Sequence, residues 1–112
     1  MARKTNRFTQ MKSKFVSLQT KTMRNFILGL LDVAEKTPEC DFFSIISEDS
    51  DMRLEFTVID ENRILAYCGK ACLEVIDTED ETYIDGSINN SRLTADKTLN
   101  LMKKLNERFD FC

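Results

Sequence analysis

Residues 42–88 contain five short runs in which apolar and polar positions alternate, as they do in half-buried β-strands. Because a one-residue slip in strand pairing would send every side chain to the opposite face, the apolar pattern of neighbouring runs tests their pairing. When the runs are paired as consecutive hairpins, their apolar residues stay in phase from one run to the next. The pattern therefore predicts a five-stranded antiparallel meander with one continuous apolar face.

The turn after the third run shows how loop length is chosen. A two-residue loop at Gly69 and Lys70, with glycine at the first central position of a type II′ turn, keeps apolar residues opposite one another. A three-residue loop would set Glu74 against Ala66 and bury a carboxylate at high cost. The shorter loop predicts the pairs Cys68–Ala71, Ala66–Leu73 and Ile64–Val75.

The remaining turns extend the same apolar face. We expect a three-residue loop at 60–62 with Asn62 in the left-handed conformation, a four-residue loop at 48–51, and an acidic turn at 78–81. The loop 89–92 should then lead out of the sheet. The predicted pairs are Val58–Ile64, Phe56–Ala66, Leu54–Cys68, Ile45–Leu54 and Phe43–Phe56, and Ile84, Gly86 and Ile88 follow on that face.

Helical periodicity appears on both sides of these runs. Apolar residues that include Val16 recur at helical spacing over about residues 12–36, and Pro38 should end that helix. A second helix should begin after Thr94, a suitable N-cap, and its Lys97, Lys103, Lys104 and Arg108 suit the helix macrodipole. We expect one α+β domain over residues 1–112: an N-terminal helix, a five-stranded antiparallel meander and a C-terminal helix. Residues 1–11 could form a flexible basic arm.

The second face of the predicted sheet is more apolar than a solvated face should be. Either the two helices cover opposite faces of the sheet, or both cover one face and the other meets a partner. In the second case the simplest partner is another copy of the chain, since two-fold dimers are the commonest oligomers. The apolar members of this face are Phe42, Ile46, Ile59, Leu65, Tyr67, Cys72, Ile76 and Tyr83.

Composition removes several kinds of chemistry. The chain has no histidine, the commonest general acid or base, and its three glycines, at 29, 69 and 86, cannot form a phosphate-binding loop. Cys68 and Cys72 should point to opposite faces, so we expect no shared metal ion. We therefore expect no catalytic residue, cofactor or metal, and free thiols in the cytoplasm rather than disulfides. The apolar run 26–31 is too short to span a membrane.

Charge is divided unevenly along the chain. Residues 1–31 hold seven Lys and Arg with no acid, whereas residues 32–112 hold nine against nineteen. The basic segment could bind nucleic acid, dock onto the acidic body or meet an acidic partner. The acidic turn around 77–81, beside Asp60 and Glu61, could bind a basic protein or a divalent ion, or serve only solubility.

The favoured interpretation is a small, non-enzymatic, intracellular interaction protein, homodimeric, that acts as a regulator, inhibitor or adaptor of a protein partner. Its predicted partner-binding residues are Ile59, Leu65, Tyr67, Ile76, Tyr83, Asp77, Glu79, Asp80 and Glu81. The alternative is a nucleic-acid-binding regulator that uses the basic N-terminal helix. Its phosphate contacts would be Arg3, Lys4, Arg7, Lys12 and Lys14.

Overall fold

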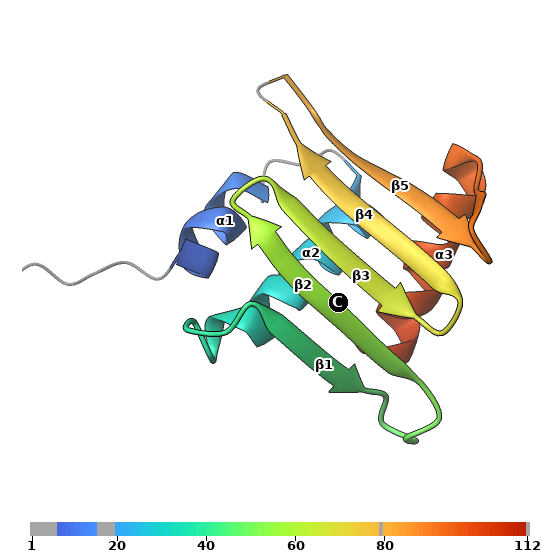
Figure 1. Ribbon diagram of the computed structural model, residues 1–112, viewed down its shortest axis with the longest axis horizontal. Coiled ribbons are helices and arrows are strands. Elements are labelled where there is room, and N and C mark those ends of the chain that lie inside the picture. The colour runs from blue at the N-terminus through green and yellow to red at the C-terminus, as the bar shows by residue number, and fades with distance from the viewer. Residues whose placement is uncertain (1–6, 16–19, 79, 112) are drawn as a thin grey trace, which may run out of the picture.

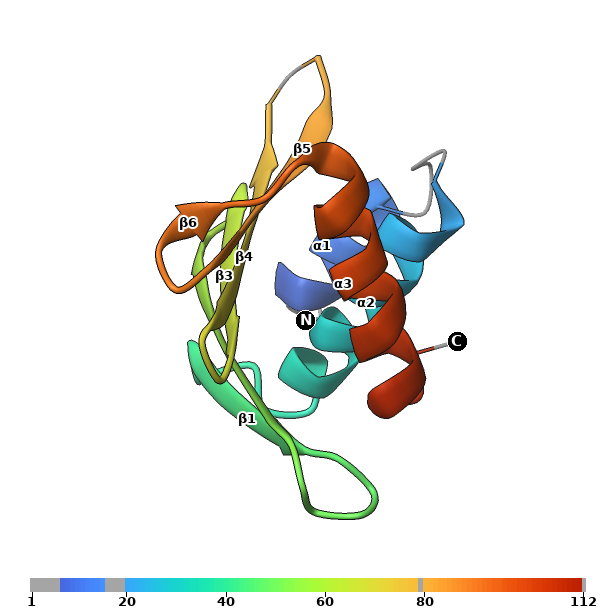
Figure 2. The same ribbon diagram turned by 90° about the vertical axis from the view of Figure 1, so that its right-hand side faces the viewer.

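A computed structural model describes residues 7–15, 20–78 and 80–111, and it confirms the α+β fold class. Within these ranges, six antiparallel strands form one sheet in chain order, and three helices pack on one side of it (Figures 1 and 2). No helix in the described ranges is long and apolar enough to cross a membrane. The elements are α1 (Arg7–Phe15), α2 (Lys21–Glu35), β1 (Phe42–Ile46), β2 (Arg53–Asp60), β3 (Arg63–Cys68), β4 (Ala71–Asp77), β5 (Thr82–Ile88), β6 (Ser91–Arg92) and α3 (Ala95–Arg108).

The predicted register of the meander is confirmed. Gly69 has φ +59°, whereas Lys70 is not among the residues with positive φ, as a type II′ turn requires. The apolar residues of the predicted pairs therefore share the helix-covered face, because side chains alternate along each strand. The observed pairs include Phe43–Phe56, Ile45–Leu54, Phe56–Ala66, Val58–Ile64, Ile64–Val75, Ala66–Leu73, Cys68–Ala71 and Val75–Ile84.

The turn between β2 and β3 differs from the expectation. Asp60 pairs with Arg63 and the register shifts at Ile59, so the turn contains Glu61 and Asn62 only, without a left-handed Asn62. The Asp60 carboxylate accepts a hydrogen bond from the backbone N–H of Asn62 at 2.7 Å, which closes the turn locally.

The segment 89–92 is not a simple loop. Asn89 and Asn90 have φ values of 52° and 66°, the combination typical of a type I′ hairpin turn. The turn folds Ser91 and Arg92 back along β5 as the short strand β6. Thr94 caps α3 as predicted, because its hydroxyl accepts a hydrogen bond from the N–H of Lys97.

The N-terminal helical region is divided rather than continuous. Thr20 has extended backbone angles and precedes α2, while α1 is a separate helix; Val16 lies outside the described residues. Residues 7–11, assigned above to a flexible arm, form the start of α1. Phe8 and Met11 from this segment are buried. The apolar side of α1 therefore packs separately from that of α2. Its Phe8 ring packs edge-on against the ring of Phe43 in β1.

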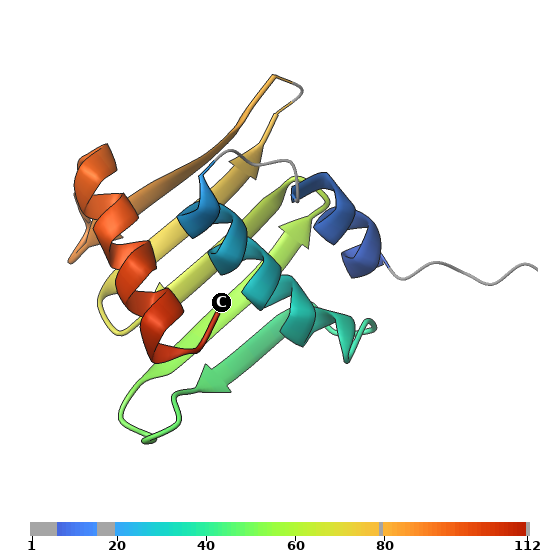
Figure 3. The same cartoon turned by 180° about the vertical axis from the view of Figure 1, so that it is seen from behind.

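The chain closes by folding back after α3, as Figure 3 shows from the helix side. Asp110 adopts the left-handed conformation with φ 58°, and the N–H of Phe111 donates to the carbonyl of Asn106 at 2.9 Å. The Phe111 ring then lies against Gly29 of α2, 6.3 Å from the ring of Phe26. Glycine at position 29 leaves the space that this ring occupies, because a Cβ there would overlap it.

Gly29→Ala should therefore lower the free energy of unfolding by about 1–3 kcal/mol, the usual cost of overpacking, although alanine is the better helix former. In a Phe111→Ala background the same substitution should instead be neutral or stabilising by up to about 1 kcal/mol. Urea denaturation of the four proteins measures both effects. An equal cost in both backgrounds would show that the Phe111 ring is not what requires glycine.

Candidate functional site

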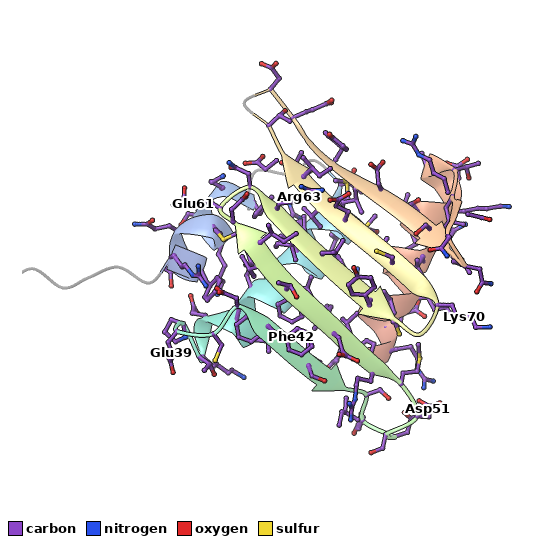
Figure 4. The ribbon with its side chains drawn as sticks, viewed as in Figure 1. Glu39, Phe42, Asp51, Glu61, Arg63 and Lys70 are labelled. Carbon is purple, nitrogen blue, oxygen red and sulfur yellow. The ribbon has the colours of Figure 1, made fainter. Side chains whose placement is uncertain are left out.

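Of the two arrangements of the helices considered above, the structure shows the one in which both predicted helical regions cover the same face, and no described element covers the other face. All described helices lie on the side opposite this uncovered face, as the edge-on view in Figure 2 shows, and Figure 4 shows the uncovered face with Phe42 and Arg63 in view. We call this surface the open face. Its strand positions are Phe42, Ser44, Ile46, Arg53, Glu55, Thr57, Ile59, Asp60, Arg63, Leu65, Tyr67, Cys72, Glu74, Ile76, Tyr83, Asp85, Ser87 and Arg92.

Large apolar side chains are exposed on the open face to an unusual degree. Two further apolar residues of this face, Leu65 and Ile76, are half-buried. Ile76 lies directly opposite Tyr83 on the neighbouring strand, so several of these groups are adjacent. The five predicted apolar partner-binding residues therefore all lie on this one surface. The most exposed apolar residues on it are Phe42 (57%), Ile46 (54%), Ile59 (47%), Tyr67 (44%) and Tyr83 (38%).

Charged groups of both signs lie on the open face. The Arg63 Nε donates to the Glu74 carboxylate at 2.6 Å, and Arg92 pairs with Asp85 at 3.3 Å. Arg53, Glu55 and Asp60 complete the set, so the open face carries one net negative charge.

The open face lacks lysine and carries tyrosine, phenylalanine and arginine, as interfaces do, although it also carries acidic residues and serine, which are depleted at interfaces. Among the residues that the structure describes, every lysine lies in a helix, a turn or a connecting segment, and none on the open face. Protein interfaces are enriched in tyrosine, phenylalanine and arginine and depleted of lysine. A shallow hollow on this face has a volume of about 280 Å³. That is below the usual range for sites that enclose a small molecule.

The structure separates the acidic residues that were predicted to form one site. Asp77 lies on the helix side of β4, where its carboxylate pairs with the Lys14 ammonium at 2.8 Å and accepts from the Thr82 hydroxyl at 2.6 Å. Asp80 and Glu81 are exposed at the turn, and Glu79 lies outside the described residues. Asp60 and Glu61, also exposed, lie at the same end of the sheet, because the N–H of Asp77 donates to the carbonyl of Asn62.

The pKa of Asp77 reflects this placement. Burial acts to raise the pKa of the carboxyl, but the hydrogen bonds from Lys14 and Thr82 and the positive charge of Lys14 together bring it below its ordinary value of 3.8. Asp77 is therefore held ionised as an attachment point for α1.

The basic segment docks onto the acidic body. Arg7 pairs with Asp41, and Lys12 pairs with Asp32 and Glu35, whereas Arg3 and Lys4 lie outside the described residues. Together with the Lys14 pair, these contacts occupy the described cations that the nucleic-acid alternative would direct at phosphates.

Cys68 and Cys72 lie on opposite faces of the sheet, as predicted from the turn. Burial raises the pKa of both thiols, and Glu74 raises that of Cys72 further. Both thiols are therefore poor nucleophiles at neutral pH.

Arg108 has a role that the sequence did not indicate. It lies in the last turn of α3, where it suits the macrodipole as predicted, and its guanidinium also pairs with Asp49 and Asp51 in the loop between β1 and β2. Only the three-dimensional arrangement brings these groups together, since they are more than fifty residues apart.

Comparison of the chain with family models, with curated proteins and with solved structures gives no match.

Asp77→Asn should destabilise the protein at neutral pH by about 1 kcal/mol or more, since it removes the charge that faces Lys14. A carboxyl whose folded-state pKa is lowered stabilises the fold above its unfolded pKa, and that stabilisation disappears as the pH falls through the folded value. The difference between wild type and variant should therefore be largest near pH 7 and shrink as the pH falls below 3.8. Chemical denaturation at several pH values measures it, and a difference independent of pH would contradict the assignment.

Proposed function

We propose that this protein is a small, non-enzymatic interaction protein that regulates a protein partner by binding it through the open face. The main observation behind the proposal is a sheet face that no helix of the described residues covers and on which large apolar side chains are exposed. Such a contiguous surface usually marks an interaction site. The absence of histidine from the sequence supports a binding role over a catalytic one.

Two arginines of the open face, Arg63 and Arg92, can be covered at a reduced cost. Burying an unpaired charge is costly, whereas a charge that already has a hydrogen-bonded partner can be covered at a smaller cost. Arg63 has Glu74 beside it, and Arg92 has Asp85. Tyrosine and arginine are also frequent among the residues that dominate binding energy. Tyr67 and Arg63 are therefore the strongest candidates for anchoring contacts.

The negative charge of the turns at one end of the sheet favours a partner with basic residues. Ile59, Arg63, Ile76 and Tyr83 lie across this corner of the open face, with Arg63 between Ile59 and Ile76, next to the turns that carry Asp60, Glu61, Asp80 and Glu81. A partner that covers this corner gains from basic residues around an apolar centre, because complementary potentials favour association. If two copies of the chain stacked corner on corner, their acidic turns would face each other. We therefore assign the open face to a different protein with a basic rim.

Photo-crosslinking in the native host provides the first test. A benzoylphenylalanine placed at Tyr67 should form a discrete adduct with one protein, whereas the same group at Asn100, exposed on α3, should not. Binding of the purified adduct partner is then measured by titration calorimetry. Wild type should bind it in a salt-sensitive manner, since the acidic turns contribute.

Leu65→Glu should weaken that complex by about 30-fold or more, because it buries an unpaired carboxylate in the contact. Asn100→Glu adds the same charge on the helix side and should change the affinity less than about 3-fold. Circular dichroism of both variants controls for folding. Equal crosslinking at positions 67 and 100, or equal affinity of the two variants, would reject the open face as the binding surface.

A further inference from the structure

The outer side of β1 has unpaired backbone groups. The N–H of Val58 donates to the carbonyl of Asp41, and the N–H of Ser47 donates to the carbonyl of Met52. In an antiparallel pair, residues that exchange hydrogen bonds alternate with residues whose N–H and C=O point away from the neighbouring strand. The odd-numbered residues of β1 therefore bond to β2. The backbone groups of Phe42, Ser44 and Ile46 point outward, where no element of the described chain covers them (Figure 1).

Strand β1 also lacks the features by which proteins protect a sheet edge. Edge strands are usually kept apart by charged side chains, proline, a bulge or a covering element. The sequence of β1 is Phe-Phe-Ser-Ile-Ile, and its register with β2 is unbroken. The exposed fractions of Phe42 and Ile46 are 57% and 54%. An uncharged apolar edge of this kind is expected to pair with another strand.

The opposite edge of the sheet is partly covered. Strand β6 pairs with the end of β5, and the N–H of Leu93 donates to the carbonyl of Gly86. The charged side chains of Asp85 and Arg92 accompany this edge. The two edges therefore differ, and only β1 presents an uninterrupted apolar strand in the described chain.

We propose that two copies of this protein join through their β1 strands in an antiparallel pair whose two-fold axis passes through Ser44. In this register Ser44 faces Ser44 of the other copy, and Phe42 faces Ile46. The outward N–H and C=O groups fall at these positions, so each facing pair can exchange two backbone hydrogen bonds.

Both faces of the joined sheet are apolar in this register. On the open face, the exposed ring of Phe42 meets the exposed Ile46 side chain of the other copy, an aromatic and β-branched pair of the kind that stabilises sheets. On the helix side, Phe43 faces Ile45, which extends the existing core across the axis. No residue of β1 carries a charge. Asp41, just before the strand, already pairs with Arg7.

The dimer is independent of the proposed function, since it uses the edge of the sheet and not its open face. The dimer would also place the open faces of the two copies side by side in one continuous surface. A partner with two equivalent sites could then bind both copies at once and gain avidity.

Light scattering behind size exclusion tests the pairing. Wild type should have twice the 13.0 kDa mass of one chain. Ser44→Pro removes a backbone donor that has no partner within the described chain, and proline is tolerated on edge strands, so the protomer should fold and run as a monomer. Ser44→Thr keeps the donor and should remain dimeric. Ile46→Lys, a second variant at an exposed position, should also be monomeric.

Hydrogen exchange provides a second measurement. The amides of Phe42, Ser44 and Ile46 should be protected in wild type at high concentration and become fast-exchanging in Ile46→Lys, while the Phe43 and Ile45 amides stay protected in both. A monomeric wild type, or a dimer that survives both Ser44→Pro and Ile46→Lys, would overturn the proposal. A dimer lost in Leu65→Glu but retained in both β1 variants would place self-association on the open face instead. If a monomeric Ser44→Pro variant still binds the partner, the open face binds the partner without the β1 dimer, and the two proposals are tested independently.

Discussion

The one-sided burial of the sheet is the constraint on which the rest of the structure depends. Phe56 and Leu73 are fully or almost fully buried under the helices, while residues that alternate with them, such as Tyr67, remain exposed. Because side chains alternate along a strand, every residue that completes the core fixes its neighbours on the other face. The core and the candidate binding surface are thus specified together. A substitution that shifted the register would exchange one for the other.

Strand pairing could be read from the sequence because the apolar pattern excludes alternatives over a few residues. The choice of the short turn at Gly69 rested on keeping Glu74 out of the core, and that local argument was sufficient. The division of the N-terminal helix could not be read in the same way, because Phe8 and Met11 continue a helical pattern. Their burial depends on contacts with β1 and other distant residues, which no local pattern contains.

The sequence predicted which strand residues share the open face, but it did not predict the residues that form long-range ion pairs; the binding role of the strand residues stays a prediction. Tyr67 and Tyr83 follow from alternation alone. Asp77 belongs by the same alternation to the helix side, but its place in an acidic turn concealed that position. Its partner, Lys14, is more than sixty residues away in the chain. The ion pairs of Arg108 were missed for the same reason, since the loop it binds is remote in sequence.

The paired asparagines at 89 and 90 set a limit to assembly. By turning the chain back along β5, they place Ser91 and Arg92 over part of the only other edge of the described sheet. A sheet with two open edges can add copies without end and grow into a filament, whereas one with a single open edge is saturated by its first neighbour. By covering the end of the β5 edge, these two left-handed residues leave less free backbone there for a further copy to pair with, which disfavours continued growth of the sheet.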